Sequence, residues 1–82
     1  MQLTKEDYDQ LKEYIPIIKH VSNGGNTSKS DVWWAMNTVE INRTGFNLSG
    51  TGCESCKVEQ YQRYWNMIQE YEANLFNLTN NN

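Results

Sequence analysis

Apolar side chains recur at helical spacing along most of this 82-residue chain, and no segment shows the apolar–polar alternation that a half-buried β-strand requires. The clearest pattern lies in the C-terminal third, where Glu72 alone interrupts a heptad-like repeat. The repeat consists of Val58, Tyr61, Trp65, Ile68 and Leu75, and is widened by Tyr64, Met67 and Tyr71. These spacings predict an all-α fold with a long C-terminal helix.

A first helix is predicted near the N-terminus. Thr4 is a favourable N-cap residue, and Asp7 follows at the third position of the helix. The apolar stripe of this helix consists of Tyr8, Leu11, Ile15 and Ile18. Pro16 lies inside the stripe and has no N–H to donate, so the helix should kink or break near Tyr14. Residues 22–28, rich in Ser, Asn and Gly, then predict a flexible loop.

The second predicted helix has apolar residues on two sides. It begins at Ser30 or Asp31 and ends before Gly45. One side carries Val32, Met36 and Val39, with Trp33 beside them. Trp34 and Ile41 lie on another side, about 100° round the helix from Trp33. A helix in a three-helix domain rarely buries both sides, so the second strip predicts a contact surface.

The chain length allows a single domain, residues 1–82. We expect three helices, over about 4–22, 30–43 and 52–76, and then a polar, frayed tail over 77–82. Thr51 and Glu54 match a capping box at the start of the third helix. Domains of this size often need a staple such as a disulfide, a metal or a partner chain.

The charge balance is mildly acidic. Seven Lys and Arg against ten Asp and Glu give a net charge of −3, and the basic residues are scattered singly. Nucleic-acid binders usually concentrate positive charge on one face, so nucleic acid is an unlikely partner. The sequence contains neither an apolar run long enough for a membrane span nor the apolar stretch of a signal peptide. We therefore expect a cytosolic or particle-associated protein.

Cys53 and Cys56 form a C-x-x-C motif at the start of the third helix. Disulfide oxidoreductases place this motif after a strand, and no strand is predicted here. Structural zinc needs four ligands, and beyond these two the chain offers only His20 before carboxylates are considered, so a site within one chain would be incomplete. The remaining interpretation is two small, partly buried residues, either reduced or joined in a local disulfide.

From the sequence we expect that this protein is not an enzyme. Ser, Asp and His residues occur in no catalytic arrangement, and the Gly24–Gly25 pair lies in a polar linker rather than after a strand. His20 is most simply a favourable charge near a helix C-terminus. We expect no cofactor, with zinc at Cys53 and Cys56 as the one alternative.

An aromatic residue and an Asn on one helix, a connector, and a C-x-S-C start to an aromatic helix form a recognisable order. The matching residues are Trp34, Asn37, Cys53, Ser55 and Cys56, followed by Tyr61 and Trp65. This half of the chain resembles small proteins of tailed bacteriophages, including crAss-like phages. The connector here, residues 45–52, is longer and richer in Gly than in those phage proteins, and fewer basic residues follow the second Cys. The resemblance implies a virion-associated or packaging-region accessory protein in a virion or host cytoplasm, and no activity.

The function we expect is a non-enzymatic protein-binding module, as a particle component or a host-directed inhibitor. Its partner would be a protein, its own copies included. Trp and Tyr dominate the energetics of binding surfaces, and this chain is rich in both. We predict a contact surface at Trp34, Asn37 and Ile41.

Two alternatives remain from the sequence. The first is a helix-turn-helix type DNA-binding or packaging factor, whose recognition side chains would be Lys57, Gln60 and Arg63 of the third helix. The second is a thiol or zinc site at Cys53 and Cys56 that mediates assembly.

Overall fold

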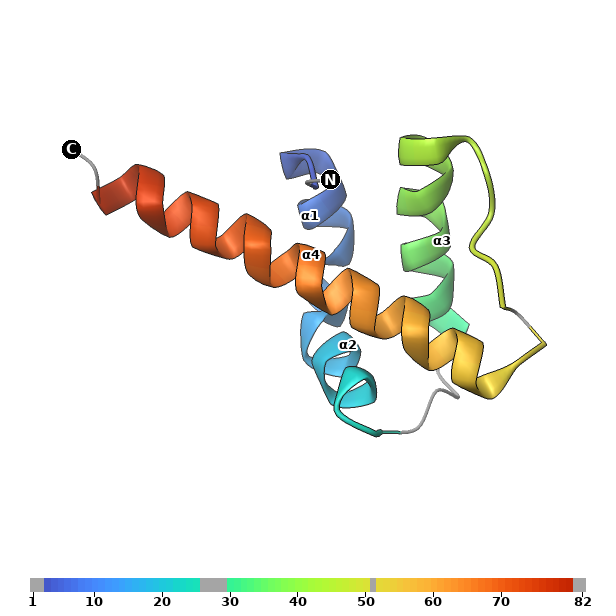
Figure 1. The fold of residues 1–82 in the computed structure, drawn as a ribbon. Coiled ribbons are helices and arrows are strands. Elements are labelled where there is room, and N and C mark those ends of the chain that lie inside the picture. The colour runs from blue at the N-terminus through green and yellow to red at the C-terminus, as the bar shows by residue number, and fades with distance from the viewer. Residues whose placement is uncertain (1–2, 26–29, 51, 81–82) are drawn as a thin grey trace.

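Helices account for nearly all regular structure in the computed structural model, which describes residues 3–25, 30–50 and 52–80. The elements are α1 (Lys5–Leu11), a 3₁₀ turn η1 (Lys12–Tyr14), α2 (Ile15–Ser22), α3 (Ser30–Thr44) and α4 (Glu54–Asn80). These ranges contain no strand, which confirms the all-α prediction. Figure 1 shows the α1–α2 arm running antiparallel to α3, with α4 crossing both. None of these helices is long and apolar enough to cross a membrane.

The N-terminal helix begins and breaks where the sequence predicts. Asp7 donates its backbone N–H to Thr4 Oγ1 at 3.1 Å, and Thr4 donates its own to Asp7 Oδ2 at 3.2 Å. This reciprocal capping box holds a buried carboxylate. The break is the η1 turn that ends at Tyr14, after which Pro16 occupies the first turn of α2. Proline is tolerated there because the N–H groups of a first turn have no partner within the helix.

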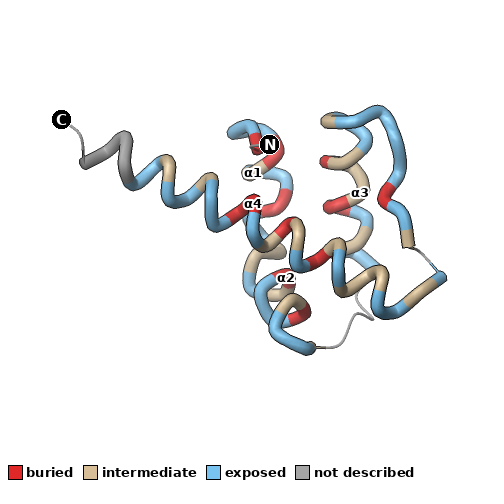
Figure 2. The backbone as a smooth tube through the Cα atoms, viewed as in Figure 1, coloured by how far each residue is buried: buried red, intermediate tan, exposed pale blue. Residues whose placement is uncertain are grey.

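The core lies where α4 crosses the other helices. Its buried members are Leu3, Leu11, Ile18, Val21, Val32, Ala35, Met36, Val39, Leu48, Tyr61, Tyr64, Met67 and Ile68. Of the predicted α4 stripe, Tyr61 and Ile68 are therefore buried, and Trp65 between them is half-buried. Leu75 is 45% exposed, because α4 projects past the other helices at that end (Figure 2).

Two predicted helix boundaries are wrong. Helix α4 begins at Glu54, so Glu54 is its first residue rather than the third that a capping box requires, and Thr51 lies outside the described residues. The helix also continues to Asn80, through most of the predicted polar tail. The end of α3 is close to the prediction, since Gly45 follows Thr44 and takes φ +81°, a conformation that glycine adopts without a steric penalty. Of the predicted loop, residues 26–28 lie outside the described ranges.

Candidate functional site

Helix α3 has a buried side and an exposed apolar side, as the sequence predicts. Its inward side carries the buried residues Val32, Ala35, Met36 and Val39. Trp34 is 67% exposed and Ile41 is 42% exposed, and with Thr38 between them they lie on one side of the helix. We call Trp34, Thr38 and Ile41 the α3 outer face. The exposed indole is the largest apolar group on this face.

A groove borders Trp34 where α3 meets the first helical arm. Its volume is about 430 Å³, and it is lined by Gln10, Glu13, Tyr14, Asp31, Trp34, Ala35 and Thr38. Glu13 and Asp31 are both exposed. Neither carboxylate has a hydrogen bond or an ion pair with another described residue. The groove therefore combines two aromatic rings with two carboxylates that no described side chain pairs.

Asn37, predicted to contact a partner, has its side chain engaged within the chain. Its Oδ1 accepts the backbone N–H of Leu48 at 2.7 Å, and its Nδ2 donates to Asn47 Oδ1 at 3.0 Å. These bonds hold the connector after α3 against the helix and direct Leu48 into the core, where it is buried. The observed role of Asn37 is thus to fix the connector.

The polar side chains proposed to read DNA are also engaged in contacts within the chain. Lys57 Nζ lies 5.8 Å from the centroid of the Trp33 ring, and Gln60 donates to Ser49 Oγ at 3.1 Å. Arg63 donates from Nη2 to Glu40 Oε1 at 3.0 Å. A recognition helix needs such groups directed outward towards base edges. The contacts therefore weigh against a DNA-reading role for α4.

A polar network joins α4 to α3 beside the core. Glu40 Oε1 accepts from both Arg63 Nη2 and the Tyr64 hydroxyl, the latter at 2.6 Å. Arg63 Nε also donates to Gln60 Oε1 at 3.0 Å. Burial, together with the hydrogen bond to Glu40, raises the pKa of Tyr64 well above its ordinary value. The network positions α4 on α3, and the tyrosine stays protonated at neutral pH.

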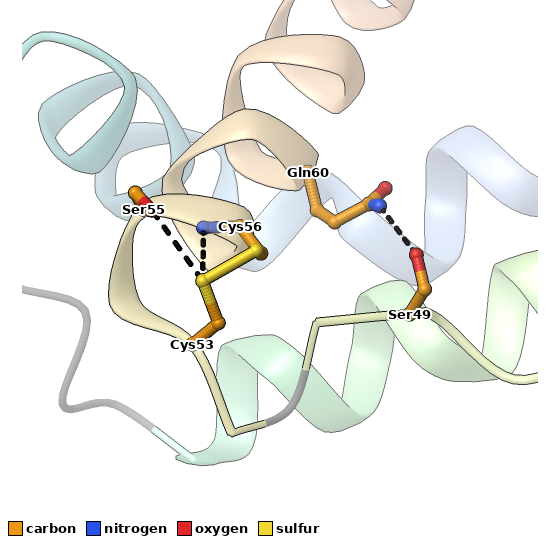
Figure 3. Close-up of a disulfide and its surroundings, with 5 residues drawn as sticks. All are labelled: Ser49, Cys53, Ser55, Cys56 and Gln60. Carbon is orange, nitrogen blue, oxygen red and sulfur yellow. Dashed lines mark hydrogen bonds between the residues drawn. A yellow bond between two sulfur atoms is a disulfide. The ribbon is translucent and has the colours of Figure 1, made fainter.

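Cys53 and Cys56 are joined in a disulfide at the start of α4 (Figure 3). Their Cα atoms lie 5.2 Å apart. Cys53 directly precedes the helix, and its Sγ accepts the backbone N–H of Cys56 at 3.3 Å, as an N-cap side chain would. Ser55 Oγ lies 3.4 Å from the same sulfur. Because the ring spans only four residues, its entropic contribution to stability is small, about 2 kcal/mol in the chain-entropy treatment.

The sulfurs are bonded to each other, so zinc at these residues would first require reduction. Among the described residues no three His, Cys, Asp or Glu side chains come together as a metal site would need. His20 lies in the last turn of α2. The zinc-mediated assembly stays a prediction.

Two further tyrosines have raised pKa values. Burial raises the pKa of Tyr61, with a further contribution from the Glu54 charge, and the hydrogen bond to Glu72 raises that of Tyr8 to about 12. A tyrosine with a raised pKa gives up its proton less readily at neutral pH, so it is less suited to act as a base.

Comparison of the chain with protein-family models, curated proteins and solved structures finds no match, so the resemblance to phage accessory proteins stays a prediction.

Proposed function

We propose that this chain is a non-enzymatic protein-binding module whose docking surface is the α3 outer face with the adjacent groove. The observation that carries the proposal is the 67% exposure of Trp34 beside a groove lined by two exposed carboxylates, Glu13 and Asp31. Trp is enriched among the hot spots of protein interfaces, where truncation of the side chain costs about 2 kcal/mol or more. The resemblance to phage proteins supports a partner within a virion or a host cell.

The chemistry of the groove favours a basic segment as the occupant. Glu13 and Asp31 supply negative charge, and the rings of Tyr14 and Trp34 supply faces over which a Lys or Arg side chain can lie. The whole chain carries a net charge of −3, which would steer a cationic partner towards it. A partner that places one basic side chain in the groove would leave its neighbouring apolar residues against Trp34 and Ile41.

The test uses peptides of defined charge. A Lys- and Arg-containing helical peptide with apolar residues on one side is titrated into the protein, and amide and indole NMR shifts are followed. We expect saturable shifts centred on Trp34 and Glu13, an affinity that falls with added salt, and little response to a peptide with Glu in place of Lys and Arg. Shifts centred elsewhere, or equal binding of the acidic peptide, would contradict the proposal.

Three variants separate specific docking from non-specific association. Trp34→Ala should weaken binding at least tenfold, in line with the cost of removing an interface anchor. Phe46→Ala is the matched control, because Phe46 is an equally apolar aromatic residue, 75% exposed, just past the other end of α3. The Glu13→Gln/Asp31→Asn double variant should remove the salt dependence. Equal losses for Trp34→Ala and Phe46→Ala would point to non-specific association instead.

A further inference from the structure

The disulfide at the start of α4 is not the only link between the connector and this helix. Other contacts already hold the connector to this helix: Cys53 donates its N–H to the Gly50 carbonyl at 3.0 Å, and Lys57 donates to the Cys53 carbonyl at 2.9 Å. Gln60 reaches back to Ser49 on the connector (Figure 3). Since these bonds do not involve sulfur, opening the disulfide would leave the connector and α4 joined.

The two sulfurs differ in their surroundings. Both cysteines are half-buried, and the connector approaches Cys56 closely, since a Cβ built on Gly50 would come within 2.6 Å of the Cys56 Cβ. Cys53 has the polar environment: its Sγ faces the Cys56 N–H and the Ser55 hydroxyl at the N-terminus of a 27-residue helix. Once reduced, that sulfur would keep both donors and the positive end of the helix dipole. The charges beside it in the chain are Glu54, which opposes a thiolate, and Lys57, which favours one.

We propose that Cys53 and Cys56 form a redox-active pair that exchanges with dithiol or disulfide groups of another protein, with Cys53 as the reacting sulfur. The inference does not depend on the α3 docking surface. It concerns the reactivity of one bond, in an all-helical setting unlike the strand-linked motif of known oxidoreductases.

The exchange balances in two steps. A thiolate of the partner dithiol attacks Cys53 Sγ, the Cys53–Cys56 bond breaks, and Cys56 leaves as a thiolate that takes up a proton. The second thiol of the partner, as a thiolate, then attacks the mixed disulfide and releases Cys53. Two electrons pass to the pair, and the partner becomes a disulfide. In the reverse direction the Cys53 thiolate attacks a partner disulfide, and Cys56 resolves the mixed species.

The first measurement is a redox titration of the whole chain. The oxidised protein is equilibrated with a series of reduced-to-oxidised glutathione ratios, quenched with an alkylating reagent, and weighed intact. We expect a reversible conversion to a doubly alkylated form within the series, with the helical circular dichroism spectrum retained. A bond that stays oxidised throughout, or one whose reduction unfolds the helices, would overturn the proposal.

Single-thiol variants then test which sulfur reacts. Cys56→Ser keeps Cys53 and should react with a chromogenic aromatic disulfide about tenfold faster than Cys53→Ser, which keeps Cys56 and lacks the two donors that face the Cys53 sulfur. Adding Ser55→Ala to Cys56→Ser should slow the reaction several-fold through the lost hydroxyl. In urea, all rates should converge, which shows that the fold causes the difference. Equal rates in the folded variants would refute the assignment of Cys53.

Discussion

Tyr64 donates its hydroxyl to Glu40 Oε1 at 2.6 Å and so connects α4 to α3 at the edge of the core. Tyr8 makes a bond of the same kind and length to Glu72, but in an exposed position. The pair offers one interaction at two levels of burial. Burial should decide its contribution, because water replaces a lost partner only at the exposed site.

Tyr64→Phe should lower the free energy of unfolding by about 1–2 kcal/mol, since the half-buried Glu40 carboxylate loses one of its two donors and keeps Arg63. Tyr8→Phe, the matched control, should cost about 0.5 kcal/mol or less, because Glu72 then bonds to water. Urea denaturation of both variants measures the difference. Similar costs for the two would show that the Glu40 network contributes nothing beyond a surface contact.

Alkaline pH should weaken the fold through Tyr8. The hydrogen bond to Glu72 raises its pKa to about 12, against an ordinary tyrosine value near 10 in the unfolded chain. The stabilisation that Tyr8 provides is fully present below pH ~10 and is lost as the pH rises through the pKa of Tyr8 in the folded chain, because only the unfolded chain releases the proton in that window. Stability measured against pH should therefore decline less steeply above pH ~10 in Tyr8→Phe. An unchanged slope would argue against the raised value.

Asn37→Ala should destabilise the chain by about 1–3 kcal/mol, because the Leu48 N–H loses its acceptor and the connector its anchor. Asn47→Ala removes only the second, exposed bond and should cost a few tenths of a kcal/mol. Thermal denaturation compares them. If Asn37→Ala were as mild as Asn47→Ala, the amide would be free for the partner-binding role that the sequence suggested.

The stability cost of replacing a glycine with alanine should depend on the backbone conformation and on the free space at each of three positions. Gly50 combines φ +90° with a close approach to Cys56, so Gly50→Ala should be the most damaging. Gly45→Ala has open space but φ +81°, and should cost about 1–2 kcal/mol. Gly52→Ala meets neither obstacle and should be neutral or slightly stabilising. Chemical denaturation gives the order, and a damaging Gly52→Ala would contradict it.

Periodicity predicted the elements of this fold better than their contacts. The broken first helix followed from Pro16, and the exposure of Trp34 followed from its angle to Trp33, because both depend on local spacing alone. The anchoring by Asn37 depends on a backbone N–H eleven residues away, which no spacing rule reveals. The pairing of Cys53 with Cys56 was one of several interpretations, since C-x-x-C suits a disulfide, a metal or a free thiol equally.

The sequence also did not predict where α4 begins and ends. An Asn-rich end read as a tail because Asn has modest helix propensity, but propagation adds a backbone hydrogen bond for each residue once a helix is established. The Thr–Glu spacing predicts a start two residues too early, because it matches a capping box, whereas Cys53 is the residue that precedes the helix and its sulfur accepts the backbone N–H of Cys56.

The length of α4 also governs how the molecule tumbles. A helix of 27 residues measures about 40 Å, close to the longest dimension of the protein, 46 Å, against 28 and 19 Å for the other two. Rotational diffusion should therefore be strongly anisotropic, with slow reorientation of the long axis. Backbone N–H vectors along α4 lie nearly parallel to that axis, so their ¹⁵N transverse relaxation should be faster than that of amides in α3, which α4 crosses (Figure 1). The direction of α4 therefore sets the slow axis of rotational diffusion of the molecule in solution.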